Sequence, residues 1–413
     1  MQEKDNVLRI LKETKRAVKS EDNVKLKELS NQTIHTASIY QDADNIAIAV
    51  LIYALSKILE RKNFQQYRNY HRFFRRFMIC IDRAISALEK NQDNYLRAQL
   101  TCIRKEINNL TGNLKKHVKE VFRKAEINKA SRIYEHGISM QQTAHLLGIS
   151  VWDLAEYTGA TGIGDVNLGI TMPEKERIKM LEEITKSNRE KILIFDSSSI
   201  INFVMNGMED TLAEFKKIFR GKLIITQQVK RETIDKPINN KLFELGALKV
   251  SKLLNNKILE LPESIGINSS IVTEKTSQIL KGLKCVFSSK NVCMHIVDDG
   301  EVSCLALSQL AQEKNIENVI VIDERTTRML GEKPENLRKL FERKFHTEIR
   351  ILQENMPKLD KIKFVRSSEL IYLAYRKNLI KLQDGKVLDA LLYATKFKGS
   401  SISIEEIEEM KRL

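Results

Sequence analysis

Four acidic residues in the second half of the sequence stand where predicted strands end or predicted helices begin: Asp196, Glu232, Glu301 and Asp323. Asp196 directly follows the apolar run ILIF, and Asp323 directly follows the apolar run VIVI. Glu232 stands early in the helix expected after a third apolar run, and Glu301 opens a further expected helix. Because the carboxyl ends of parallel strands face one crevice where the strand order reverses, we expect these acids to lie together.

Carboxylates gathered in this way predict a metal site. Crowded carboxylates repel one another and raise one another's pKa values unless a cation neutralises them. Mg²⁺ or Mn²⁺ suits such a group because hard oxygens are the preferred ligands of both ions. A metal bound there would activate water and stabilise the charge that develops on a phosphodiester during hydrolysis.

Each acid taken alone also fits a purely structural role. Asp196 precedes three serines and could cap a helix. Asp299 and Glu301 could simply stabilise the start of a helix through its dipole. The order of the four acids along the chain is what favours a joint chemical role.

The elements that must position these acids form an α/β pattern. Residues 192–195, 223–225 and 319–322 are short apolar runs rich in β-branched residues, typical of parallel strands covered on both faces. The run 302–310 between them has a helical pattern. The sequence therefore predicts an α/β/α domain over residues 191–413 with a mainly parallel sheet. A helical connector, 166–190, precedes it, with a helix that begins near Pro173 and ends near Lys186.

Four segments, ILIFDSSSIINF, IITQQVKRET, DDGEVSCLALSQL and VIVIDERTTRML, occur in this order. Together they resemble the PIN-domain nuclease superfamily. The tail SSELIYLAYRKNLIKLQDGKVLDALLYATKFKGSSISIEEI resembles the C-terminal extension of an uncharacterised branch of that superfamily near the toxin-type (VapC-like) proteins. The resemblance covers roughly Lys191 to Leu413. The segment from Pro262 to Asp298 is longer than in compact PIN toxins, and an additional helix, 334–345, follows the last acid.

The resemblance implies a metal-dependent endoribonuclease that hydrolyses RNA with metal-activated water and leaves a 5′-phosphate. It implies that the catalytic acids are Asp196, Glu232, Glu301 and Asp323. Of these, Asp196, Glu301 and Asp323 would bind Mg²⁺ or Mn²⁺. Ser198 would support Asp196, and Asp299 would be an extra ligand or an outer supporting group.

The segment 113–165 contains a pattern typical of a helix-turn-helix. Ser139 can cap a helix that starts at Met140, Gly148 can supply the turn, and Ser150 can cap the next helix. The pattern resembles the small antitoxins often encoded beside PIN toxins, which would make DNA a partner. However, the second helix, 151–157, carries Asp153 and Glu156 and no Lys or Arg, whereas DNA readers present bases and amides to the groove. Dimerisation, or packing on the nuclease domain, is the alternative.

Residues 1–112 are expected to form a helical bundle because the first 111 residues contain neither Gly nor Pro. Within this bundle four arginines fall on one helical face: Arg68, Arg72, Arg75 and Arg76. We expect these arginines to contact RNA, with a merely solvated helix face as the alternative, and the aromatic residues between them to belong to the core rather than to stack on bases.

The composition sets the limits of these interpretations. The 413 residues carry 69 Lys and Arg against 54 Asp and Glu, a net charge of +15 that suggests a polyanionic partner. The longest apolar run, 46–55, is about half of what a membrane span needs, and the N-terminal residues lack the pattern of a secretory signal. The five cysteines are scattered without a C-x-x-C motif, which predicts neither a zinc site nor a disulfide framework and fits a reducing cytoplasm.

Three functions remain open at this stage. The first is a cytoplasmic endoribonuclease whose N-terminal helical segments bind RNA or a partner protein. That partner could be a second copy of the chain, which would make a homodimer. The second is a non-catalytic nucleic-acid-binding regulator in which the α/β domain is a scaffold. The third is a toxin and antitoxin fused in one chain, in which the helix-turn-helix segment restrains the nuclease.

Overall fold

The structure, a computed structural model, describes residues 3–60, 70–109, 115–163, 166–289, 292–359, 361–382 and 384–413. The chain divides into two compact units, Met1–Ile133 and Tyr134–Leu413. The division falls inside the predicted helix-turn-helix segment, 113–165, so only its part from Tyr134 onward clusters with the connector and the sheet in the second unit. The boundaries expected at 112, 165 and 190 do not coincide with this division. None of the described helices is long and apolar enough to cross a membrane.

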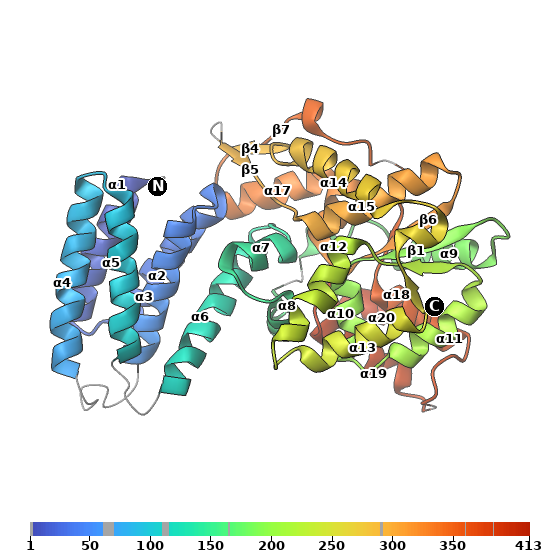
Figure 1. Cartoon of the computed structure of the whole chain (residues 1–413), viewed down its shortest axis with the longest axis horizontal. Helices are drawn as coiled ribbons and strands as arrows, with labels where there is room; N and C mark the ends of the chain where they lie inside the picture. Colours follow the sequence, from blue (N-terminus) through green and yellow to red (C-terminus); the bar gives the residue numbers. More distant parts are fainter. Residues whose placement is uncertain are drawn as a thin grey trace. The chain divides into compact units, whose positions relative to one another are not determined.

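The first unit is helical, as the absence of Gly and Pro predicts (Figure 1). Its described helices are α1 (Lys4–Lys19), α2 (Asn23–Tyr40), α3 (Ala43–Leu59), α4 (Tyr70–Glu89), α5 (Asp93–Asn109) and α6 (Lys115–Glu135), the last of which crosses the boundary. Asp22 caps α2 by accepting a hydrogen bond from the backbone N–H of Lys25 at 2.8 Å. The apolar run 46–55 lies inside α3, where it forms part of the core of this unit.

The expectation that the cysteines form no disulfides was wrong. Cys80 is joined to Cys102, and Cys285 to Cys293, whereas Cys304 is free and buried. Cys80 and Cys102 lie on the neighbouring helices α4 and α5, about equally far from the turn between them, so the hairpin brings them together. Spacing along the sequence does not reveal such a pair because the contact depends on how two helices align.

The second unit contains, in its described part, a five-stranded sheet and a three-stranded sheet. The order of the larger sheet is β3-β2-β1-β6-β8, and all its strand pairs are parallel. Its strands are β1 (Lys191–Phe195), β2 (Lys222–Ile224), β3 (Leu259–Glu260), β6 (Glu317–Val321) and β8 (Phe364–Val365). The smaller, antiparallel sheet consists of β4 (Phe287–Ser289), β5 (Val292–Met294) and β7 (Arg350–Ile351). The prediction of a mainly parallel sheet is confirmed.

Helices cover the parallel sheet. Every residue of β1 is buried, which shows that both faces of the sheet are covered. The helices of this unit are α7 (Met140–Leu147), α8 (Val151–Thr161), α9 (Glu174–Lys186), α10 (Ser197–Met205), α11 (Glu209–Phe219), α12 (Gln227–Lys230), α13 (Glu244–Asn255), α14 (Ser269–Leu283), α15 (Asp299–Glu313), α16 (Arg325–Glu332), α17 (Pro334–Phe345), α18 (Ser367–Arg376), α19 (Val387–Phe397) and α20 (Ile404–Arg412). A π-helical turn, Arg231–Asp235, continues α12.

The strand order places the carboxyl ends of β1 and β6 side by side. β1 pairs with β2 on one side and with β6 on the other, so the chain changes direction across the sheet at β1. The backbone N–H of Asp196 extends this pairing by donating to the carbonyl of Val321 at 3.0 Å. This is the reversal point at which the acids are expected to meet.

Candidate active site

Asp196 lies fully buried at the carboxyl end of β1. Its Oδ2 accepts hydrogen bonds from the backbone N–H and the hydroxyl of Ser198, at 2.9 and 2.6 Å. Asp196 therefore caps α10, and Ser198 supports it as the resemblance implies. Its other oxygen, Oδ1, accepts a hydrogen bond of 3.0 Å from the side-chain amide of Gln141. Burial raises the pKa of Asp196.

Glu301 lies in the first turn of α15, fully buried. Its Oε2 accepts a hydrogen bond from the backbone N–H of Asp298 at 3.0 Å, which supports the structural role considered for this residue. Its Oε1 is buried and has no hydrogen-bond partner among the described residues. Burial and then the negative charge of Glu324 raise the pKa of Glu301 well above its usual value.

Glu324 is an acid that the sequence analysis missed. It caps α16 with Oε2, which accepts from the backbone N–H of Thr327 at 2.9 Å. Its Oε1 is buried and, like that of Glu301, lacks a partner in the described part of the chain. The negative charge of Glu324 contributes to the raised pKa of Glu301, which indicates that the two carboxyl groups are near each other. The sequence feature that could have identified Glu324 is its position next to Asp323, directly after a predicted strand.

Glu232 points into the same site from the π-helical turn after α12. Its Oε2 accepts a hydrogen bond from the hydroxyl of Ser197. A Cβ atom added to Gly300 would lie 2.5 Å from Glu232 Oε1 and 2.8 Å from Gln141 Oε1, so a larger residue before Glu301 would have to displace these two side chains. Burial, followed by the charges of Asp196 and Asp298, raises the pKa of Glu232 to about 8.

The carboxylate of Asp323 is occupied by serines. It accepts hydrogen bonds from the backbone and hydroxyl of Ser367, at 2.8 and 2.6 Å, and from the hydroxyl of Ser400 at 2.9 Å. Its backbone N–H donates to Ser198 Oγ at 3.1 Å, which places the residue beside the site. Asp323 thus holds α18 at the sheet edge, and Glu324 supplies the unpartnered oxygen.

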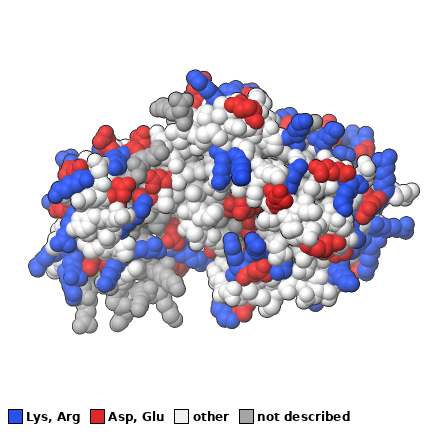
Figure 2. All heavy atoms as spheres, turned by 45° about the horizontal axis from the view of Figure 1, so that its top comes forward, with Lys and Arg blue, Asp and Glu red and all other residues white. Residues whose placement is uncertain are grey.

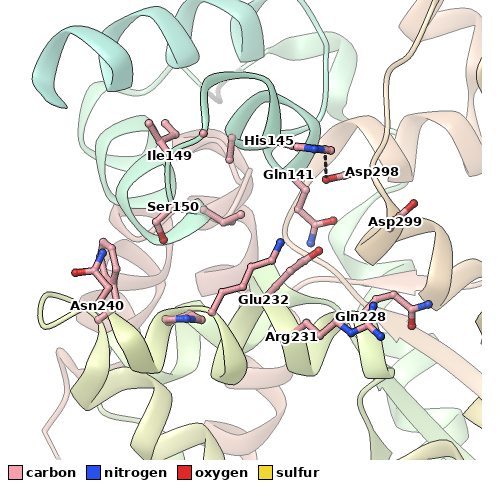
Figure 3. Close-up of a pocket in the computed structure, with 16 residues that line it drawn as sticks. Gln141, His145, Ile149, Ser150, Gln228, Arg231, Glu232, Asn240, Asp298 and Asp299 are labelled. Carbon is pink, nitrogen blue, oxygen red and sulfur yellow. Dashed lines mark ion pairs between the residues drawn. The ribbon is translucent and has the colours of Figure 1, made fainter. Parts of the chain in front are cut away.

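A cavity of about 500 Å³ has Glu232 in its lining, whereas Asp196, Glu301 and Glu324 are buried and are not among its described lining residues (Figure 3). One wall comes from α7, the turn after it and the start of α8, and the other from the segment 228–243. Asp299 is exposed and lines this cavity. Next to it, Asp298 pairs with His145 Nδ1 at 3.3 Å (Figure 3).

The helix-turn-helix segment packs on the sheet-bearing part of its own unit. Ser139 and Ser150 cap α7 and α8, and Gly148 forms the turn with a φ of 64°, as the sequence predicts. In the second helix, Trp152 packs so closely on Gly246 that an added Cβ would lie 2.5 Å from its ring. Of the alternatives left open for this segment, packing within the chain is the one observed.

Gln141 is the contact between this segment and the acids. It is 3% exposed. Its amide nitrogen donates to Asp196, and its amide oxygen accepts from the backbone N–H of Glu301 at 2.9 Å. Figure 3 shows Gln141 and Glu232 approaching each other from opposite walls of the cavity. An amide side chain therefore lies between two of the acids.

Carboxylate oxygens near Asp196 are of the chemical kind that a divalent cation binds. Two unpartnered carboxylate oxygens, on Glu301 and Glu324, lie in the same site as Asp196, and such oxygens are the donors that Mg²⁺ and Mn²⁺ bind. Within the described ranges, no three His, Cys, Asp or Glu side chains already surround a common position. The hydrogen bond from Gln141 occupies one oxygen of Asp196, so this amide has to move before that oxygen binds a cation.

The arginines predicted to contact RNA belong to the first unit. Arg68 is outside the described residues. Arg72, Arg75 and Arg76 are exposed on α4, and Arg76 pairs with Glu106 at 3.1 Å. The nearby aromatic residues Tyr70, Phe73 and Phe77 are buried, as expected of core residues. Figure 2 shows basic and acidic groups interspersed on the face that it presents. RNA contact by these arginines stays a prediction.

No protein-family model matches this chain, and no match was found among curated proteins or solved structures. Assignment of the second unit to a nuclease therefore depends on its own residues.

The raised pKa of Glu232 predicts a pH effect on stability without metal. Its pKa is about 8 in the folded chain against an ordinary 4.5, so its contribution is complete below pH 4.5 and is lost as the pH rises through 8. We expect the Tm in EDTA to fall less between pH 6 and pH 9 for Glu232→Gln than for the wild type. Asp235→Asn, on the same turn, is the control and should keep the wild-type slope. Equal slopes for Glu232→Gln and the wild type would contradict the raised pKa.

Proposed function

We propose that the second unit is a metal-dependent endoribonuclease of the PIN type. The observation that supports it is that Gln141 contacts both Asp196 and the backbone of Glu301, with Glu232 next to Gly300 and the charge of Glu324 acting on Glu301. Asp196, Glu301 and Glu324 are buried and Glu232 is half-buried, and neighbouring carboxylates of this kind are costly to a fold unless a cation or protons neutralise them. Three of the acids were expected from the sequence, and Glu324 joins them.

Different residues would have different roles in such a site. Asp196, Glu301 and Glu324 would hold Mg²⁺ or Mn²⁺, which would supply activated water and stabilise charge on the phosphodiester. Ser198 orients Asp196, and Ser197 orients Glu232. With a pKa of about 8, Glu232 can accept or release a proton near neutral pH. Arg231 and Lys236, exposed on the cavity wall, can bind phosphate groups on either side of the reacting one.

The direct test is cleavage of a 5′-labelled RNA by the purified full chain. We expect cleavage in Mg²⁺ or Mn²⁺, no cleavage in EDTA, and 5′-phosphate on the downstream product. Cleavage that persists in EDTA would instead indicate a metal-independent contaminant or mechanism.

A second candidate is a nuclease restrained by its own helix-turn-helix segment. The bridge from Gln141 to Asp196 and to the backbone of Glu301 favours it, because the amide occupies an oxygen that a cation would need. Under this proposal the resting chain cleaves RNA slowly, and release of α7 from the site raises the rate. The two candidates share one active site and differ in the effect of Gln141.

A further inference from the structure

A second cavity, of about 920 Å³, lies in the same unit and shares no lining residue with the one at the acids. It is bounded by the segment that leads into α9, by the end of α16 and the start of α17, and by residues 356–359 and 361–363 before β8. β8 is the edge strand of the parallel sheet. The cavity is therefore a separate surface feature next to the sheet edge.

The floor of this cavity is apolar and adaptable. Leu330, Leu359 and Ile362 are buried at its base. Three methionines add half-buried side chains: Met172, Met180 and Met356. Methionine is unbranched and polarizable, so surfaces rich in it adjust to apolar side chains of different shapes. An exposed apolar depression of this kind is typical of interaction sites.

The rim is basic. Four exposed lysines line it: Lys333, Lys358, Lys361 and Lys363. None of the four makes an ion pair with a described carboxylate. The one acid among the described lining residues, Glu332, is already bound by Arg177 at 2.7 Å. Among its described residues, the rim thus carries four lysines without an ion-pair partner around an apolar floor.

The chemistry of the lining favours a peptide over a nucleic acid. Single-stranded nucleic acids bind to grooves in which aromatic side chains stack on the bases. Among the described residues that line this cavity, none is aromatic and the only cationic side chains are lysines. An amphipathic peptide, in contrast, places apolar side chains in such a groove and polar ones at its rim.

We propose that this cavity, which we call the lysine-rimmed groove, binds an acidic amphipathic segment of a partner protein. Leucine-like side chains of that segment would contact Met172, Met180 and Met356. Its carboxylates would pair with the four lysines, which provides specificity and speeds association. This proposal does not depend on the proposed nuclease activity.

The experiment starts with selection of displayed random 16-residue peptides on the immobilised full chain. We expect the enriched peptides to carry net negative charge and at least two large apolar residues. A fluorescein-labelled copy of the best peptide is then titrated with the protein, and its anisotropy is followed. A failure to enrich any such peptide, or enrichment of basic ones, would overturn the proposal.

Variants locate the binding. The double variant Lys358→Glu/Lys361→Glu should weaken peptide binding at least tenfold. Met180→Glu should also weaken binding, because it places a charge in the apolar floor of the groove. The double variant Lys12→Glu/Lys19→Glu, which makes the same charge change on α1, should bind like the wild type. Equal weakening by both double variants would show a general charge effect, and displacement of the peptide by polyuridine would show a phosphate site; either result would overturn the proposal.

Discussion

Replacing Asp196 with asparagine is expected to reduce metal-dependent RNA cleavage by the full chain about 100-fold or more. The change keeps the size of the side chain, and its remaining oxygen can still accept from Ser198, so α10 keeps its cap. It removes the negative charge that, in our proposal, attracts the cation. The loss should therefore appear in the rate of cleavage with little change in the circular dichroism spectrum.

The matched control is Asp210→Asn. Asp210 lies in the same unit, at the start of α11, but its side chain is exposed and pairs with Lys381. An exposed pair of this kind contributes little to stability, so this variant should cleave RNA at the wild-type rate. Equal cleavage by Asp196→Asn and the wild type would remove Asp196 from the catalytic site.

Replacing Gln141 with alanine is expected to lower the Mg²⁺ concentration that gives half-maximal cleavage, by about tenfold. A hydrogen bond to a charged group contributes roughly 1.5–3 kcal/mol, and about 1.4 kcal/mol corresponds to a tenfold change in an equilibrium constant. In the wild type, cation binding has to break the bond between Gln141 and Asp196. In the variant this cost is absent.

Gln142→Ala is the control for this second prediction. Gln142 is the next residue on α7 and is 4% exposed, similar to the 3% of Gln141, but its side-chain oxygen has no described partner. It should leave the Mg²⁺ dependence unchanged. A higher Mg²⁺ requirement for Gln141→Ala would show that the amide supports the active arrangement, and would argue against restraint by the helix-turn-helix segment.

The sheet and most of its acids were predictable because the signals are local. Continuous apolar runs specify parallel strands, and the residue that follows each strand has to lie at its carboxyl end. Glu324 was missed because two adjacent acids follow β6, and the sequence does not tell which carboxylate enters the site. That choice depends on Ser367 and Ser400, which are distant in sequence and bind Asp323.

In the helix-turn-helix segment, too, the local sequence predicts the elements, whereas distant contacts decide where they lie. Its caps and its turn follow from Ser139, Gly148 and Ser150, each of which acts on neighbouring backbone groups. Its place beside the acids depends on contacts such as that between Gln141 and Asp196, 55 residues apart. The acids Asp153 and Glu156 argue locally against DNA reading, but nothing in the local pattern identifies the surface on which the helix packs.

The central claim is that the buried acids bind a divalent cation, and calorimetric titration of the full chain with Mn²⁺ at pH 8 tests it most directly. We predict saturable binding by the wild type and loss of that binding in Asp196→Asn and in Glu301→Gln/Glu324→Gln. Mn²⁺ uptake that is the same in the wild type and in both variants, or no uptake by the wild type, would contradict the claim.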